Sequence, residues 1–252
     1  MRVGKRPYRS IWLAADGWAV EIIDQARLPF HFAVVRLESA GAAMDAIRRM
    51  LVRGAPLIGA TAAYGICLGL REEAHEGQLE RLATELIDCR PTAVNLRWAV
   101  ERMLGRLRPL PAGERLRAAY AEDELICDED VAVNEAIGNH GLGLIQALWQ
   151  GKNSREPVRI LTHCNAGWLA TVDWGTALAP VYKAAAAGIA VHVLVDETRP
   201  RNQGASLTAW ELAEAGIPHH LIVDNAGGHL MPRGLVDRCL VGPDRASAPG
   251  AV

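Results

Sequence analysis

Hydrophobic residues in the first 40 positions fall in short, β-rich runs separated by turn residues, a pattern typical of strands. Strands are expected over 11–13 and 18–23, which flank the turn dipeptide Asp16-Gly17. Another β-rich run covers 31–37, after Leu28-Pro29. The chain is therefore expected to begin with a small group of strands.

From Ala40 the hydrophobic spacing changes to that of helices. Met44, Ile47 and Leu51 recur at intervals of three and four residues, which places them on one helix face. Thr92 is expected to cap a later helix, and Gly138 to interrupt the last helical stretch. The same spacing predicts further helices over 57–70, 79–87, 96–107 and 113–149.

Beyond Pro157, short apolar runs alternate with helical stretches. This alternation predicts βαβ units and a parallel sheet. The expected strands cover 158–162, 190–195, 220–223 and 238–241, with helices over 169–187 and 208–215. The predicted class is α/β, with a mixed strand and helix N-terminal domain over 1–135 and a Rossmann-like domain over 136–252.

Composition excludes several classes of protein. The 252 residues are 50% hydrophobic and 22% charged, which is enough to bury a sizeable core. With 27 basic against 29 acidic residues, the chain lacks the basic excess of a nucleic-acid binder. The charge-free stretch 54–70 is shorter than a spanning helix requires, and Asp16 interrupts any signal-peptide core. We expect no membrane partner.

Cysteine and histidine usage indicates a reduced compartment and no metal. The five cysteines form an odd number without C-x-x-C spacing, which favours free thiols in a cytoplasm over disulfides. None of them clusters with histidine at the spacing of a zinc site, so a metal is not predicted.

Polar residues follow each strand of the expected parallel sheet, where ligands bind in open α/β folds. Cys164 follows the first of these strands and precedes an expected helix, whose dipole would lower the pKa of its thiol. Asp196, Asp224 and Asp244 follow the other three strands. A strand-end aspartate also commonly caps the next turn, so for Asp224 and Asp244 both interpretations stay open.

Arginine-led turns suggest a site for an anionic ligand. Arg53-Gly54-Ala55 and Arg90-Pro91-Thr92 stand at expected helix starts, where free backbone N–H groups add to the guanidinium. The loop 199–203, which ends at Gln203, carries further donors. No G-x-G-x-x-G motif follows a strand, so a dinucleotide cofactor is not expected.

Several motifs together resemble those of methylthioribose-1-phosphate isomerases. They occur in the family's order and cover nearly the whole chain. The family belongs to a superfamily with ribose-1,5-bisphosphate isomerase and regulatory subunits of translation initiation factor 2B. The matching motifs are Arg53-Gly-Ala-Pro-Leu-Ile-Gly, Arg90-Pro-Thr-Ala-Val-Asn-Leu, Thr162-His-Cys-Asn-Ala-Gly, Asp196-Glu-Thr-Arg-Pro-Arg-Asn-Gln-Gly, Asp224-Asn-Ala-Gly-Gly-His-Leu-Met and Val241-Gly-Pro-Asp-Arg.

The resemblance implies an aldose–ketose isomerisation in methionine salvage, without a metal or nucleotide cofactor, in a cytoplasmic homodimer. Asp244 is then the proton donor, and Cys164 stabilises the transition state or moves the proton. The residues that match substrate-binding positions are Arg53, Gly54, Ala55, Arg90 and Gln203.

This chain departs from the family pattern near its end. Pro243 replaces an alanine beside Asp244, and an Asn-Lys pair that contacts substrate in the family has no counterpart before Val252. The expectation from these departures is a Rossmann-like domain without its C-terminal part, a fragment of low stability and impaired activity.

Three alternatives remain. One is a non-catalytic subunit like those of initiation factor 2B. The second is an isomerase of another pentose phosphate, such as 5-deoxyribose 1-phosphate or ribose 1,5-bisphosphate. The third is a cysteine-dependent hydrolase, which is disfavoured because His163 should point away from Cys164 across the strand.

Overall fold

The computed structural model describes residues 1–72 and 77–242, which form two compact units. One unit comprises Arg9–Val131, and the other combines Met1–Tyr8 with residues from Ala132 onward. The sequence did not predict that the first eight residues join the later unit, in which β1 (Arg2–Val3) and β2 (Arg6–Pro7) form a short antiparallel pair. The domain boundary after residue 135 stays a prediction.

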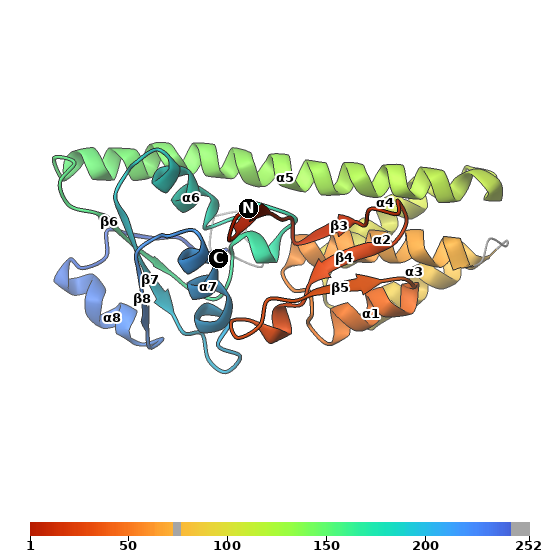
Figure 1. Ribbon diagram of the computed structural model, residues 1–252, viewed down its shortest axis with the longest axis horizontal. Coiled ribbons are helices and arrows are strands. Elements are labelled where there is room, and N and C mark those ends of the chain that lie inside the picture. The colour runs from red at the N-terminus through yellow and green to blue at the C-terminus, as the bar shows by residue number, and fades with distance from the viewer. Residues whose placement is uncertain (73–76, 243–252) are drawn as a thin grey trace. The chain divides into compact units, whose positions relative to one another are not determined.

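The Arg9–Val131 unit combines an antiparallel sheet with packed helices (Figure 1). Its strands pair in the order β3-β4-β5, and they lie within the short β-rich runs that predicted them. Its core consists mainly of apolar side chains from the strands and helices, and every residue from Leu57 to Leu70, on one helix, is buried. The elements are β3 (Ile11–Leu13), β4 (Val20–Ile23), a 3-10 turn (Gln25–Arg27), β5 (Val34–Leu37), α1 (Ala40–Arg48), α2 (Ala55–Glu72), α3 (Gln78–Cys89) and α4 (Val94–Leu107).

The predicted cap of α4 is wrong. The residue before the helix is Ala93, which supplies no side-chain hydrogen bond, and Thr92 lies one residue too early. The backbone N–H of Ala93 bonds to the carbonyl of Arg90, which closes a turn between α3 and α4. This turn sets the helix start.

The expected interruption near Gly138 is also wrong, because α5 runs without a break over Ala112–Gly151. Glycine weakens a helix because its backbone is more flexible than that of other residues. A glycine inside a long helix is therefore expected where close packing leaves no room for a side chain. A Cβ at Gly138 would lie 3.1 Å from Cβ of Ala179, and one at Gly141 would lie 2.4 Å from Pro180. The glycines thus allow α5 to lie close against α6 (Ala179–Ala186).

The later unit contains the predicted parallel sheet, which confirms the α/β class. Its strand order is β8-β7-β6-β9, and each adjacent pair is parallel. The chain moves from β6 through β7 to β8 on one side, then returns to the other side of β6 for β9. The elements are β6 (Val158–Thr162), β7 (Val191–Asp196), α7 (Ala209–Glu214), β8 (His219–Ile222), α8 (Ala226–Leu230), a 3-10 turn (Met231–Arg233) and β9 (Arg238–Cys239).

This strand order creates a topological switch point between β6 and β9. The connections between parallel strands of one sheet are right-handed. Because the chain changes direction across the sheet after β8, α6 and α7 cover one face and α8 covers the other. Both central strands are nearly continuous runs of buried apolar residues, as expected for strands covered on both faces. The crevice outside the carboxyl ends of β6 and β9 is where a ligand binds in such folds.

The first half of the helix predicted over 169–187 is instead a 3-10 turn (Trp168–Ala170) and a hydrogen-bonded loop, and only the second half is helical, as α6. The Thr171 hydroxyl donates to the carbonyl of Asp173, whose carboxylate accepts from the Met1 ammonium at 2.7 Å. Trp174 and Gly175 adopt positive φ angles of 68° and 79°, which no helix permits. The regular helix begins only at Ala179, so the helix-dipole argument does not apply to Cys164.

After β7 the chain enters a π-helical turn, Gly204–Thr208, that leads into α7. This start is earlier than the helix predicted from residue 208. A Cβ on Gly204 would lie 1.8 Å from the carbonyl oxygen of Asp196, so only glycine allows this close approach. The approach fixes the position of the preceding Gln203.

Asp237 holds β9 to the start of β6. Its Oδ2 accepts from Lys152 Nζ at 2.6 Å and from the backbone N–H of Arg159 at 2.7 Å. Burial alone would raise the pKa of Asp237, but these donors outweigh it and hold the pKa below its usual value.

Asp237→Asn is expected to lower the free energy of unfolding at neutral pH by about 1–2 kcal/mol, because it removes a charged acceptor. A carboxylate whose folded pKa is lowered stabilises the protein above its usual pKa of 3.8 and loses that contribution as the pH falls below this value. The variant and wild type should therefore converge in acid. Urea unfolding at neutral and acidic pH measures the difference in free energy of unfolding between the variant and wild type. Asp45→Asn, at an exposed aspartate, is the control. A difference that does not change with pH would contradict the role given to the Asp237 carboxylate.

Among the helices within the described residues, none combines the length and apolar character needed to cross a membrane.

Candidate active site

Cys164 lies just beyond the carboxyl end of β6, in the loop at the switch point. It is half-buried, and its φ angle of 60° places it in the left-handed region. The thiol Sγ lies 3.3 Å from Oε1 of Gln203, to which it donates. Two of the residues predicted from the sequence therefore meet, although 39 positions separate them along the chain.

The loop after β7 brings Gln203 to Cys164. Both carboxylate oxygens of Asp224 accept backbone N–H groups from this loop, those of Thr198 at 2.7 Å and Arg199 at 2.8 Å. The N–H donors of Arg199 and Thr198 also hold the pKa of Asp224 below its usual range. Asp224 thus holds the loop that follows the neighbouring strand β7, which is a different role from capping the turn after its own strand.

His163 has a partner other than the thiol. Its Nδ1 lies 2.9 Å from Oδ2 of Asp196, while its ring is exposed. Burial raises the pKa of Asp196, and the hydrogen bond with His163 opposes this shift. The hydrogen bond of Cys164 Sγ is with Gln203, so this geometry gives no support to a Cys–His hydrolase.

His163, Asp196 and Asp224 also offer ligand atoms that all lie within 4.8 Å of one another, a spacing compatible with a metal ion. Their hydrogen bonds already explain this arrangement. His163 bonds to Asp196, and both oxygens of Asp224 accept backbone N–H groups. The prediction that no metal takes part stays a prediction.

A buried carboxylate supports the loop that carries Cys164. Glu211 of α7 is fully buried and accepts hydrogen bonds at 2.6–3.0 Å from Asn165 Nδ2, the N–H groups of Trp168 and Leu169, and the hydroxyl of Tyr182. Burial raises the pKa of Glu211, and these donors act in the opposite direction. A Cβ on Gly167 would lie 1.8 Å from Glu211 Oε2, so the loop must have glycine there.

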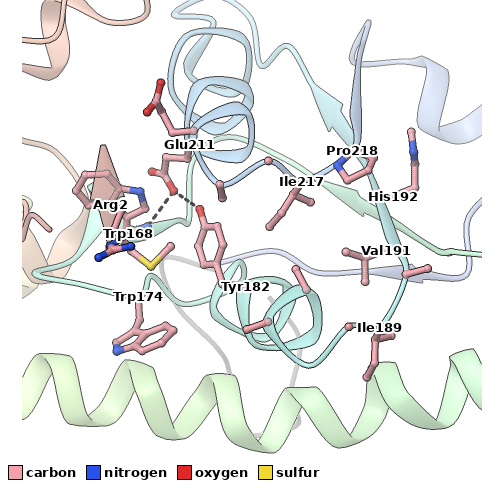
Figure 2. Close-up of a pocket in the computed structure, with 18 of the residues that line it drawn as sticks. Arg2, Trp168, Trp174, Tyr182, Ile189, Val191, His192, Glu211, Ile217 and Pro218 are labelled. Carbon is pink, nitrogen blue, oxygen red and sulfur yellow. Dashed lines mark hydrogen bonds between the residues drawn. The ribbon is translucent and has the colours of Figure 1, made fainter. Parts of the chain in front are cut away.

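A cavity of about 840 Å³ lies at the opposite, amino edge of the sheet. Figure 2 shows Trp168, Tyr182 and Glu211 on one side of it and Val191 and Pro218 on another. Val191 begins β7, and Pro218 immediately precedes β8. Because the catalytic loops of such folds follow the carboxyl ends of strands, this cavity is distinct from the candidate active site.

Asp244 lies outside the described residues. The chain reaches it from β9 through Gly242, which packs against the Cys164 loop: a Cβ there would lie 2.7 Å from Cβ of Ala166 and 2.9 Å from Oγ1 of Thr176. The last described residue is therefore next to the candidate site, two positions before Asp244. The role of Asp244 stays a prediction.

The remaining predicted substrate-binding residues belong to the Arg9–Val131 unit. Gly54 has a φ angle of 89°, and Ala55 begins α2, so the backbone N–H groups of the first helical turn have no partner within the helix. Arg53 is buried. Arg90 follows the end of α3 instead of starting a helix, and its Nη1 is buried without a hydrogen-bond partner among the described residues.

A parallel sheet with a switch point, and a cysteine loop at its carboxyl edge, defines a Rossmann-like α/β protein with a candidate ligand site at that edge. The sequence model of the initiation factor 2 subunit family matches residues 51–252. The chain therefore belongs to this family, and its similarity to curated members lies with the methylthioribose-1-phosphate isomerases.

One such relative, the methylthioribose-1-phosphate isomerase of Rhodospirillum rubrum, is 60% identical and is matched over all of this chain and 66% of its own length. The solved 5-methylthioribose 1-phosphate isomerase of Pyrococcus horikoshii OT3 is 36% identical, with a TM-score of 0.84 over 98% of this chain and 68% of that one. A structure from A. fulgidus titled translation initiation factor eIF-2B, subunit delta, is 39% identical, with a TM-score of 0.82 over 95% and 69%. The chain thus spans about two thirds of the length of these relatives.

The sequence did not single out Glu211, Thr198 or Thr208, all of which contact the Cys164 loop. One signal was available for Glu211. It lies four residues after buried Leu207 and beside buried Leu212, at a core position of the helix pattern. A carboxylate at such a position requires buried donors.

Proposed function

We propose that this chain catalyses the aldose–ketose isomerisation of 5-methylthioribose 1-phosphate to 5-methylthioribulose 1-phosphate in methionine salvage. The observation that carries the proposal is the 3.3 Å contact between Cys164 Sγ and Gln203 Oε1 at the switch point. The resemblance assigns catalysis to the first residue and substrate binding to the second. The 60% identity to a relative with this name supports the same activity.

The reaction has to solve a definite chemical problem. A phosphate on C1 keeps the sugar as a closed ring, so the bond between C1 and the ring oxygen breaks while the phosphate stays. The ring oxygen takes up a proton, hydrogen moves from C2 to C1, and the C2 hydroxyl loses its proton as C2 becomes a carbonyl. All atoms of the substrate are kept in the product.

The proposed roles follow from this chemistry. Asp244 gives the proton to the ring oxygen, and Cys164 acts at the carbons between which hydrogen moves. Gln203 orients a sugar hydroxyl with its amide while its oxygen accepts from the thiol. The packing of Gly242 against Ala166 supports a site in which the residues after β9 act together with Cys164.

The phosphate requires cationic and N–H donors. We assign it to Arg53, Gly54, Ala55 and Arg90, because the start of α2 offers backbone N–H groups that have no partner within the helix and Arg90 keeps an unpartnered buried nitrogen among the described residues. The resemblance extends the proposal to a cytoplasmic homodimer. The five cysteines are free thiols, which suits that compartment.

A second candidate function is a non-catalytic subunit. It is favoured by the 39% identity to the structure titled initiation factor eIF-2B, subunit delta. An isomerase acting on ribose 1,5-bisphosphate or 5-deoxyribose 1-phosphate is a variation of the first proposal, since it requires the same transfer between C1 and C2.

Phosphorus NMR of the purified chain with each sugar phosphate distinguishes these functions. The expected result is conversion of 5-methylthioribose 1-phosphate to a ketose phosphate, faster than conversion of ribose 1,5-bisphosphate or 5-deoxyribose 1-phosphate. Faster turnover of either of the other sugars would change the assigned substrate. A folded chain that binds all three without converting any would favour the non-catalytic function.

A further inference from the structure

The backbone of Cys164 is held in a conformation that residues with a side chain rarely adopt. Its φ angle is 60°, and Thr198, which contacts it, has a φ of 64°. Such residues persist only where surrounding contacts fix them, and they gather at functional sites. The contacts that fix Cys164 therefore indicate how its thiol is aimed.

Two threonine hydroxyls bond to the two polar backbone groups of Cys164. Thr198 Oγ1 accepts from the Cys164 N–H at 2.7 Å and donates to the carbonyl of Asp196 at 3.0 Å. Thr208 Oγ1 donates to the Cys164 carbonyl at 2.6 Å and accepts from Asn165 Nδ2 at 3.1 Å. Each hydroxyl has one proton, so its single donor role is taken by the carbonyl that it contacts, while its oxygen accepts one N–H.

Both threonines are themselves fixed by buried or charged groups. The backbone N–H of Thr198 donates to Asp224 Oδ1 at 2.7 Å. Thr208 is 1% exposed and shares the amide of Asn165 with the fully buried Glu211. The two hydroxyls thus connect the backbone of Cys164 to two other segments, the loop after β7 and the start of α7.

We propose that Thr198 and Thr208 are positioning residues that clamp the Cys164 peptide and aim Sγ at Gln203. The inference rests on the proposed function in one respect, since aiming the thiol matters for turnover only if Cys164 acts in the isomerisation. The clamp itself acts on the backbone of Cys164, and its effect on the reactivity of the thiol is measurable without substrate.

The test compares Thr198→Val and Thr208→Val, which replace the hydroxyl by a methyl group of similar size, with Thr198→Ser and Thr208→Ser, which keep it. Ser206→Ala is the matched control, because its hydroxyl donates to Asn202 in the same segment and does not reach Cys164. The rate of Cys164 alkylation by iodoacetamide is followed by peptide mass spectrometry, with exposed Cys239 as the internal reference. Circular dichroism checks folding, and kcat and KM are measured in parallel.

The valine variants should release the thiol from Gln203 and raise the Cys164 alkylation rate about 5-fold, relative to Cys239, since freed thiols are more accessible. They should also lower kcat by about 10- to 100-fold with little change in KM, because a misplaced group loses rate more than binding. Both serine variants and Ser206→Ala should match wild type in both measurements.

Wild-type alkylation rates in the valine variants would overturn the clamp, as would serine variants that differ from wild type. If one valine variant does not fold, the other carries the test, because each threonine bonds to a different backbone group of Cys164. A raised alkylation rate in a protein whose wild type has no isomerase activity would uphold the clamp and refute the proposed function instead.

Discussion

Replacing Cys164 with alanine is expected to lower kcat for the isomerisation by about 10²- to 10⁴-fold, the range for loss of a group that handles protons in the transition state. The thiol is half-buried and donates a hydrogen bond to Gln203, so its loss leaves the sheet and its core intact. Steady-state kinetics with 5-methylthioribose 1-phosphate, together with a thermal melt of each protein, measures the effect.

Cys239→Ala is the matched control, because Cys239 lies on β9 of the same sheet with an exposed side chain. Its kcat should stay within about 2-fold of wild type, since it has no place in the proposed chemistry. A Cys164→Ala protein with wild-type kcat would remove Cys164 from the mechanism.

Glu211→Gln is expected to lower the free energy of unfolding by about 2–4 kcal/mol, the cost of leaving buried groups without a partner. The carboxylate is fully buried, and groups around it donate hydrogen bonds to its oxygens, among them Asn165 Nδ2 and the Tyr182 hydroxyl. An amide would turn one acceptor oxygen into an NH₂ group that faces these donors. Denaturant unfolding followed by tryptophan fluorescence measures the loss.

Glu214→Gln on the same helix provides the comparison. Glu214 is exposed and accepts the backbone N–H of Gly4 at 2.9 Å. Its substitution should change the free energy of unfolding by about 0.5 kcal/mol or less, as for most surface sites. Equal losses for the two variants would show that the network around Glu211 does not support the Cys164 loop.

Hydrophobic spacing predicted the elements whose burial is regular along the chain. Strand β6 lies where the run 158–162 predicted it, because the central strand of a parallel sheet is apolar on both faces. Spacing failed where contacts distant in sequence decide the backbone. The run from Leu169 looks helical, but the Met1 ammonium bonds to Asp173 and the loop crosses Gly175 with a positive φ.

The same distinction applies to the candidate site. Cys164 and Gln203 were found because they belong to motifs, and a parallel sheet brings the ends of neighbouring strands together. Thr198 and Thr208 act through hydroxyls that bond to the backbone of another segment. Threonine is common on loops and helix starts, so no local pattern distinguishes these two from others.

The most direct test of the central claim is whether substrate protects Cys164 from alkylation. Peptide mass spectrometry follows iodoacetamide modification of Cys164 and of exposed Cys239 in one sample, with and without 5-methylthioribose 1-phosphate. If the sugar phosphate binds at the carboxyl edge of the sheet, it should slow modification of Cys164 by about 10-fold or more at saturation and leave Cys239 unchanged. An unchanged Cys164 rate at saturating sugar phosphate, with binding confirmed separately, would place the ligand elsewhere and contradict the proposed active site.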